Sequence, residues 1–257
     1  NLTTLVAGLG RMRAAGRLDD LALTTNGTQL ARLAAPLKEA GLDRINVSLD
    51  TLDADTFARV TRRGSLPRVL EGLAAARAAG LGVKINTVAL KGVNDHEIPA
   101  LVRWCGAQGF DMSLIETMPM GEVSGDRNDT WLPLTELRET LARDLTLVDL
   151  PDETTGGPSR YVRVMETGRR LGFISPLSAC FCDGCNRVRV TCTGQLYLCL
   201  GREDGADLRA PLRASDDDEA VKQTLQNAIA RKAHGHDFQI EPGAEPTTAR
   251  HMSVTGG

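Results

Sequence analysis

Two hydrophobic periods alternate along the first 118 residues of the chain. Segments with apolar residues every three to four positions alternate with short apolar runs that are typical of buried strands. Strands separated by helices of 10 to 15 residues indicate parallel βαβ units, so this part of the sequence predicts an α/β fold. The predicted strands are residues 21–25, 44–49, 82–90 and 112–118, and the predicted helices are residues 1–16, 29–40, 54–61, 66–79 and 95–108.

The pattern changes after Met118. Segments rich in Gly, Pro and Asp follow, and the apolar runs become short enough for antiparallel hairpins. We therefore expect a boundary near residues 119–130, with a sheet-forming portion at 1–118 and a different C-terminal region at 119–257. The elements predicted beyond the boundary are a helix at 134–142, strands at 161–165, 171–174, 188–192 and 195–200, a helix at 216–233 and an extended tail at 235–257.

The amino-acid composition limits the kinds of partner that the chain can bind. A chain of 257 residues with 42% hydrophobic content can bury a large core, and a net charge of −3 implies no polyanion partner. An aromatic content of 4% argues against stacking on single-stranded nucleic acid, so no nucleic-acid partner is expected. No apolar run approaches the roughly 20 residues of a membrane span, so no membrane partner is expected. Six unevenly spaced cysteines and no visible signal segment favour a reducing, cytoplasmic location over a disulfide framework.

Cys182, Cys185 and Cys199 follow the pattern C-x2-C-x13-C. A hairpin that turns at Thr193-Gly194 would carry Cys199 back toward the loop with the other two, and three convergent thiolates form a soft-metal site. Thiolates hold both zinc and iron–sulfur clusters, and the spacing alone does not decide between them. A structural zinc site would need a fourth ligand, for which the candidates are Cys180, Cys192, His234, His236 and His251.

The residues around these thiols resemble a known family. Residues 181–191, Gly194 and Cys199-Leu200 are similar to the C-terminal cluster segment of the GTP 3′,8-cyclases, the radical S-adenosylmethionine enzymes that open molybdenum cofactor biosynthesis. The last six residues resemble the double-glycine tail of that family. The resemblance runs from residue 1 to residue 257, and the barrel motifs that match in order are residues 23–27, 46–53, 83–88 and 115–118.

The resemblance implies a fold and a set of ligand sites. The fold would be an incomplete parallel (β/α) barrel, followed by an antiparallel hairpin region that carries an auxiliary cluster. Cys182, Cys185 and Cys199 would hold a [4Fe–4S] cluster with one open iron that binds the guanine of GTP. The remaining residues implied are Thr24, Lys84, Arg187, Val188 and Arg189 for GTP, Ser48 and Met118 for S-adenosylmethionine, and Gly256 and Gly257 for a tail that reaches the active site with Arg250 as its anchor.

Several of these residues have ordinary alternatives. Arg187 and Arg189 alternate along a predicted strand and so share one face, where solvated arginines are also common. We expect Cys105, Cys180 and Cys192 to be small buried residues without a role.

The implied activity is that of a lyase. It converts GTP to 3′,8-cyclo-7,8-dihydro-GTP through a radical derived from S-adenosylmethionine. The implied partners are GTP, S-adenosylmethionine, an electron donor and the downstream cyclic pyranopterin monophosphate synthase pathway, with a homodimer as an option. Two alternatives stay open here: another radical S-adenosylmethionine enzyme with an auxiliary cluster, and a zinc-stabilised module without catalysis.

Two family features do not occur in the sequence. An N-terminal C-x3-C-x2-C loop, which would hold a second [4Fe–4S] cluster, and a Gly-Gly-Glu-Pro segment are both missing. We therefore expect a fragment that lacks its first βα unit and is inactive by itself.

Overall fold

The computed structural model describes residues 1–121, 127–153, 156–238 and 246–255. The chain divides into two compact units. The first unit consists of Asn1–Glu116 and Leu132–Ile174, and the second consists of Thr117–Trp131 and Ser175–Gly257. Residues 132–174 thus join the sheet-forming portion, whereas the sequence placed them in the C-terminal region. The division into functional regions at residue 118 stays a prediction.

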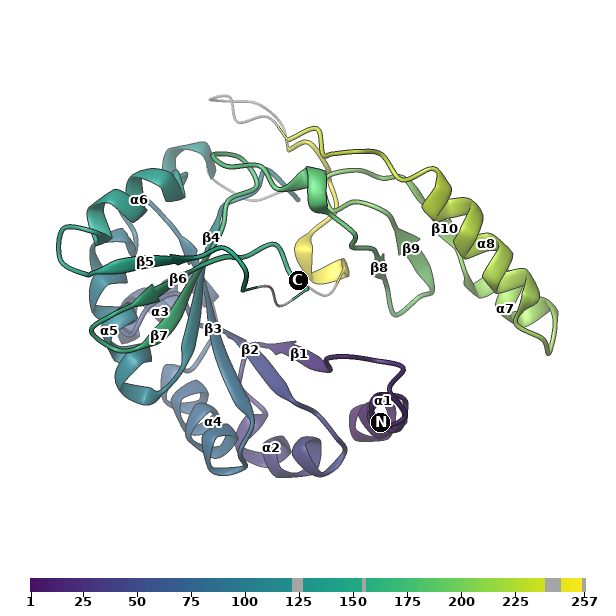
Figure 1. Cartoon of the computed structure of the whole chain (residues 1–257), viewed down its shortest axis with the longest axis horizontal. Coiled ribbons are helices and arrows are strands. Elements are labelled where there is room, and N and C mark those ends of the chain that lie inside the picture. Colours follow the sequence, from purple (N-terminus) through teal and green to yellow (C-terminus); the bar gives the residue numbers. More distant parts are fainter. Residues whose placement is uncertain (122–126, 154–155, 239–245, 256–257) are drawn as a thin grey trace. The chain divides into compact units, whose positions relative to one another are not determined.

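The first unit is built on a seven-stranded mixed sheet (Figure 1). Its strand order is β1-β2-β3-β4-β7-β6-β5, in which β1 to β4 and β7 are parallel neighbours and β5 and β6 are antiparallel. This mixed α/β class with a parallel-rich sheet agrees with the prediction, while closure into a barrel stays a prediction. The strands are β1 (Ala22–Thr25), β2 (Arg44–Ser48), β3 (Gly82–Ala89), β4 (Asp111–Glu116), β5 (Leu147–Leu150), β6 (Arg160–Val164) and β7 (Arg169–Ile174).

Helices α2, α4 and α5 lie along one face of this sheet (Figure 1). The side chains of Ile45, Val47 and Ile85 on that face are fully buried, together with Leu37 of α2 and Val69 of α4. Burial of each such side chain contributes about 1.5–3 kcal/mol to stability. The helices are α1 (Leu2–Ala14), α2 (Leu30–Glu39), α3 (Ala54–Thr61), α4 (Leu66–Ala78), the 3₁₀ turn η1 (Asp95–Glu97), α5 (Ile98–Gln108) and α6 (Leu134–Leu141).

Local chemistry explains where these elements begin and end. The side chain of Asp53 caps α3 by accepting from the Thr56 N–H at 2.8 Å. Gly27 follows β1 with φ +78°, and a Cβ there would lie 3.0 Å from Val69 and 3.1 Å from Val47. The Asn26-Gly27 pair is therefore a turn, as the sequence predicted, and the structure shows that it lets α4 pack closely on the sheet.

The opposite face of the sheet is polar. Along β2, buried Ile45 and Val47 alternate with half-buried or exposed Arg44, Asn46 and Ser48. The same alternation runs along β3. A strand buried on one face only has this period of two. The polar face carries the candidate ligand residues of the first unit.

The hairpin of β6 and β7 belongs to this sheet. Residues of β7 pair in parallel with β4, in a register that sets Leu171 opposite Met112. The sequence predicted both strands but grouped them with the cysteine segment, and it did not predict β5. Apolar runs indicate that a strand exists, whereas its hydrogen-bonding partner depends on tertiary packing.

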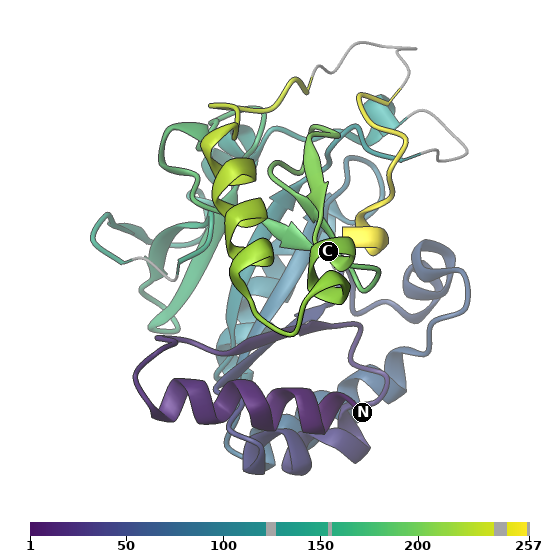
Figure 2. The ribbon, with the colours of Figure 1, turned by 90° about the vertical axis from the view of Figure 1, so that its right-hand side faces the viewer.

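The second unit holds a small antiparallel sheet of order β10-β9-β8. Its core contains Leu196, Leu198 and Ala228, and helices α7 and α8 lie next to each other (Figures 1 and 2). The predicted cysteine hairpin is present with shorter strands, while β10 and α7 were not predicted. The elements are η2 (Arg127–Thr130), η3 (Cys182–Gly184), β8 (Arg189–Val190), β9 (Gln195–Tyr197), β10 (Gly205–Asp207), α7 (Arg209–Ala214), α8 (Glu219–Ala230) and η4 (Met252–Thr255).

Among the described residues, no helix has both the length and the apolar character needed to cross a membrane.

Candidate functional site

The cysteine loop is a tight turn followed by a hairpin. Cys182 opens η3, and the Cys185 N–H donates to the Cys182 carbonyl at 3.0 Å. The hairpin turns at Gly194, whose φ of +85° suits glycine and whose N–H donates to Thr191 at 3.0 Å. Cys199 follows two residues after the end of β9. The local chain path is the one that the Thr193-Gly194 turn predicted.

The thiols of this loop lie within electrostatic reach of one another. Burial raises the pKa of Cys182, and its neighbours Cys180 and Cys199 raise it further. Burial also opposes ionisation of Cys185, but the hydrogen bonds from Arg187 and the charge of Lys232 outweigh it and lower the pKa of this thiol. The Arg187 guanidinium donates to the Cys185 sulfur at 3.4 Å. Thiolate donors are what an iron–sulfur cluster requires, so the donor chemistry fits the predicted cluster.

The tightest group of metal-ligating atoms is a different one. Within the described ranges, the ligand atoms of Cys180, Cys182 and His236 lie within 4.8 Å of one another. Cys180 and Cys192 are exposed, so the expectation that they are buried is wrong; they lie in loops outside the packed strands. Cys105 is buried as expected, and burial raises its pKa to about 12. The assignment of a cluster to Cys182, Cys185 and Cys199 stays a prediction.

Arg187 and Arg189 share a face of the chain. From Cys185 to Val190, half-buried residues alternate with exposed ones, which places Cys185, Arg187 and Arg189 on one side and Val188 on the other. The Arg187 guanidinium stacks over the Phe181 ring at 4.8 Å. Burial lowers the pKa of Arg189, and the charges of Arg187 and Arg250 lower it further. A half-buried set of like charges favours an anion as counter-charge.

Arg250 holds the C-terminal segment against the loop that follows Cys199. Its side chain is 5% exposed and donates to the carbonyls of Leu200 and Arg202, both at 2.8 Å. The guanidinium also lies over the Tyr197 ring at 4.0 Å. This geometry supports the expected anchoring role of Arg250. The predicted tail residues Gly256 and Gly257 lie outside the described residues.

The first unit places three predicted ligand residues on its polar face. Thr24 pairs in register with Asn46, and Asn46 pairs with Lys84. Thr24, Asn46 and Lys84 therefore form one cross-strand row of the sheet. The Asn46 side-chain amide donates to the Thr24 hydroxyl at 3.3 Å. Ser48 is exposed at the carboxyl end of β2. Ligands of parallel α/β folds bind at such ends, which suits the predicted role of Ser48.

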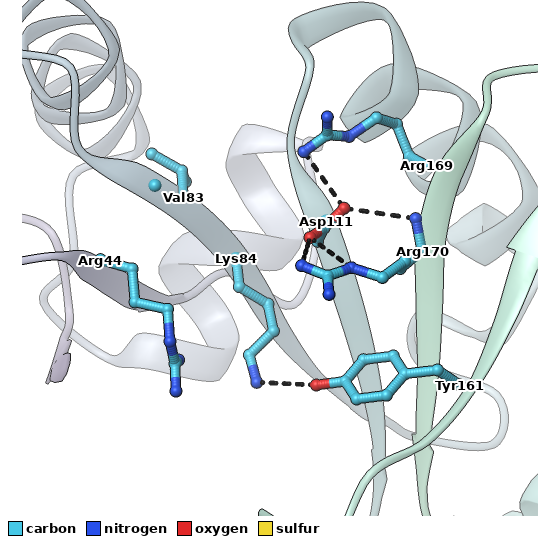
Figure 3. Close-up of a pocket in the computed structure, with 8 residues that line it drawn as sticks. Arg44, Val83, Lys84, Asp111, Tyr161, Arg169 and Arg170 are labelled. Atoms are coloured by element: carbon cyan, nitrogen blue, oxygen red, sulfur yellow. Dashed lines mark hydrogen bonds and ion pairs between the residues drawn. The ribbon is translucent and has the colours of Figure 1, made fainter. Parts of the chain in front are cut away.

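Lys84 borders a cavity of about 200 Å³ (Figure 3). Its ammonium donates to the Tyr161 hydroxyl at 3.4 Å. Asp111 in the same cavity pairs with Arg169 at 3.1 Å and with Arg170 at 2.6 Å. Sequence reasoning missed these neighbours, although polar and apolar residues alternate from Asp111 to Leu114 along β4.

The predicted ligand residues are divided between the two units. Thr24, Lys84 and Ser48 belong to the first unit. Met118 lies in the second, two residues after β4, and its carbonyl accepts from the Met120 N–H at 2.8 Å. The arginines and cysteines also lie in the second unit.

Two family models match the chain. The radical SAM superfamily matches residues 4–105, and the family described as Molybdenum Cofactor Synthesis C matches residues 110–238. The α/β fold and the thiol-bearing second unit are thus those of a radical S-adenosylmethionine enzyme of molybdenum cofactor synthesis.

Relatives define the family more narrowly. The GTP 3′,8-cyclase of Rhizobium meliloti (strain 1021) is 60% identical over 258 residues, which cover 100% of this chain and 74% of the relative. The GTP 3′,8-cyclase of Mesorhizobium japonicum is 57% identical, over 100% of this chain and 78% of the relative. The GTP 3′,8-cyclase of Agrobacterium fabrum is 56% identical, over 100% of this chain and 74% of the relative. The chain belongs to the GTP 3′,8-cyclase family.

A solved radical SAM methyltransferase from Sphaerobacter thermophilus is a much more distant match. It is 19% identical, with a TM-score of 0.33 over 48% of this chain and 37% of its own.

Proposed function

We propose that this chain binds GTP for conversion to 3′,8-cyclo-7,8-dihydro-GTP, with its phosphates held by Lys84, Arg187 and Arg189. Membership of the GTP 3′,8-cyclase family supports the reaction. The observation that carries the phosphate assignment is the ion pairing around the cavity of the first unit. Arg44 is paired with Asp20 there, and Arg169 and Arg170 are paired with Asp111.

Lys84 differs from these three arginines. Across the described part of the chain it has no acidic partner, and its ammonium donates to the Tyr161 hydroxyl. An ammonium on a polar sheet face without a counter-ion is free to bind a phosphate oxygen. Thr24, in the same cross-strand row, adds a hydroxyl donor or acceptor for the ligand.

Arg187 and Arg189 supply the planar donors on the second unit. Guanidinium groups bind phosphate oxygens bidentately, and their half-burial keeps water from screening them. The Val188 side chain faces the opposite way, so we assign only its backbone to the nucleotide.

Cys182, Cys185 and Cys199 are the residues we assign to a [4Fe–4S] cluster. When bound, this group supplies an iron without a protein ligand, a Lewis acid for a purine nitrogen or oxygen. The hydrogen bond from Arg187 to Cys185 favours the thiolate that ligation needs. We assign Ser48 and Met118 to S-adenosylmethionine, and we propose the double-glycine tail as a further contact.

The phosphate assignment is tested by nucleotide binding. We expect Lys84→Met to weaken GTP binding by roughly 10- to 100-fold in equilibrium dialysis, because a hydrogen bond to a charged group contributes about 1.5–3 kcal/mol. Binding of guanosine, which has no phosphate, should stay unchanged. Lys38→Met, at an exposed position of α2, is the matched control. Equal losses for GTP and guanosine would mean that Lys84 acts on the base or on folding, and unchanged GTP binding would remove it from the site.

The same design applies to the second unit. Arg189→Ala should weaken GTP binding by a similar factor, with exposed Arg213→Ala of α7 as its control. Unchanged binding in Arg189→Ala would refute the role of the arginine face.

The cellular context is proposed on the family alone. We place the chain in the cytoplasm, with an electron donor upstream and cyclic pyranopterin monophosphate synthase downstream, and we propose a homodimer as its assembly. Analytical ultracentrifugation tests the last point, since a monomer at micromolar concentration would contradict it.

A further inference from the structure

Two segments of the second unit meet at the sulfur of Cys182. One is the loop between β7 and η3, which carries Cys180, and the other follows α8 and carries His236. The Cys180 sulfur lies 3.9 Å from the His236 Nε2 atom. A Cβ at Gly235 would lie 3.4 Å from the Cys182 sulfur, so the backbone beside His236 runs against this thiol.

His236 is held in place by its surroundings. Arg202 donates to the Gly235 carbonyl at 2.8 Å and to the Asp237 carboxylate at 2.6 Å, which anchors the residues on both sides of the histidine. The ring also packs on Phe238 with a centroid distance of 4.5 Å. A ring fixed in this way loses little further freedom when it becomes a ligand.

We propose that Cys180, Cys182 and His236 form a mononuclear zinc site that shares only Cys182 with the three-cysteine set. Two thiolates and an imidazole are a ligand set that zinc accepts, with a fourth position for water. Tetrahedral zinc with Zn–S near 2.3 Å and Zn–N near 2.0 Å would separate the donor atoms by about 3.5–3.8 Å. The donors here lie within 4.8 Å, so they approach that geometry through shifts of about 1 Å.

Binding requires defined changes in the histidine and the thiols. The His236 Nε2 atom lies 2.9 Å from the Pro176 carbonyl, and Nδ1 accepts from the Phe238 N–H at 3.2 Å. Zinc at Nε2 replaces the first contact and moves the ring proton to Nδ1, which ends the second. The two thiols release one proton each, so zinc uptake frees two protons and no electron is transferred.

Cys182 belongs to both ligand sets. Zinc on Cys180, Cys182 and His236 therefore removes one of the three thiolates from Cys182, Cys185 and Cys199. Zinc at this site should oppose loading of the cluster. This second part of the proposal rests on the proposed function, whereas zinc binding itself does not.

Metal titration of the full chain, made metal-free under anaerobic conditions, tests the site. Zinc is titrated against a chromophoric chelator, and cobalt serves as a probe whose thiolate charge-transfer absorption reports sulfur ligation. We expect His236→Ala and Cys180→Ala each to weaken zinc binding by at least about 100-fold, because each removes one of three protein ligands. Cys192→Ala and His234→Ala, which change an exposed cysteine and an exposed histidine of the same unit, should bind zinc as the parent chain does.

Cys185→Ala separates the two ligand sets. This variant should keep the zinc affinity of the parent chain and lose iron and sulfide after cluster reconstitution. If Cys185→Ala loses zinc as His236→Ala does, zinc occupies the predicted cluster cysteines and the separate site is refuted. Parental zinc affinity in both His236→Ala and Cys180→Ala would refute it as well.

Competition is measured by iron and sulfide content after reconstitution. Zinc added first should lower cluster loading in the parent chain and have little effect in His236→Ala. Equal inhibition in both would overturn the competition. If the parent chain takes up no cluster without zinc, the cluster assignment of the proposed function fails, and the zinc titration still decides the site.

Discussion

Replacing Arg250 by alanine should destabilise the second unit and release the segment 246–255. The guanidinium connects three parts of that unit: the aromatic ring that ends β9, the loop after Cys199 and the C-terminal segment. Near Arg250, that segment is also held by Thr248, whose carbonyl accepts from the Gly121 N–H at 2.8 Å and whose hydroxyl donates to Glu203.

The magnitude follows from the contacts of the guanidinium. Two hydrogen bonds from a charged donor contribute about 1.5–3 kcal/mol each, and a desolvated cation–π contact contributes about 2 kcal/mol. Against this stand the Nε and Nη1 atoms, which are buried without a hydrogen-bond partner among the described residues and cost about 1–3 kcal/mol each. With middle values, the contacts exceed the penalty by about 2.5 kcal/mol. Water can hydrate the two carbonyls that lose their donor, so the expected loss is about 2–3 kcal/mol.

Urea unfolding and hydrogen exchange together measure this loss. The free energy of unfolding should fall by that amount. The Gly121 N–H donates to Thr248 and the Thr247 N–H donates to Pro119, so these two amides report on the attachment of the C-terminal segment. Both should exchange at least about 30-fold faster. Arg250→Lys should recover part of the loss, because an ammonium can donate to the carbonyls but does not stack as a plane. Arg213→Ala on the exposed surface of α7 should leave both readouts unchanged. Unchanged stability and exchange in Arg250→Ala would refute the anchoring role.

Three further predictions test the first unit. Gly172→Ala should cost about 1–3 kcal/mol in denaturant unfolding, because a Cβ there would lie 2.3 Å from Ser159 Oγ and 2.9 Å from the ring of Tyr161; Gly8→Ala, where a Cβ would meet Arg11 Nη2 at an ordinary contact distance of 3.9 Å, should not destabilise the protein. Burial raises the pKa of Asp50 above its ordinary 3.8, against a hydrogen bond from the Val88 N–H, so the charged form is disfavoured in the folded state. Asp50→Asn should therefore be more stable than the parent at pH 8, and the difference should shrink as the pH falls toward 3.8 and Asp50 protonates; a difference that grows on acidification would reverse the sign of the argument. Cys105 is 1% exposed with a pKa raised to about 12, so iodoacetamide should label it only in the unfolded chain, and native labelling detected by mass spectrometry would contradict the packing of α5.

The sequence by itself determined the features that are local in the chain. The order of strands and helices up to β4 followed from hydrophobic period, and the turns at Gly27 and Gly194 followed from glycine chemistry. The alternation of Arg187 and Arg189 followed from the period of an extended chain. Each of these depends on residues within a few positions of one another, where backbone geometry leaves few choices.

The tertiary structure alone decided which distant segments become neighbours. It paired β7 with β4, and it set Tyr161 beside Lys84 from 77 residues away. It also placed His236 beside Cys180, 56 residues apart, where spacing had left five candidate ligands open. An isolated strand or loop exposes the same donors toward any partner, so local pattern contains no information on which one it meets. That choice depends on how the buried faces of the whole unit pack together.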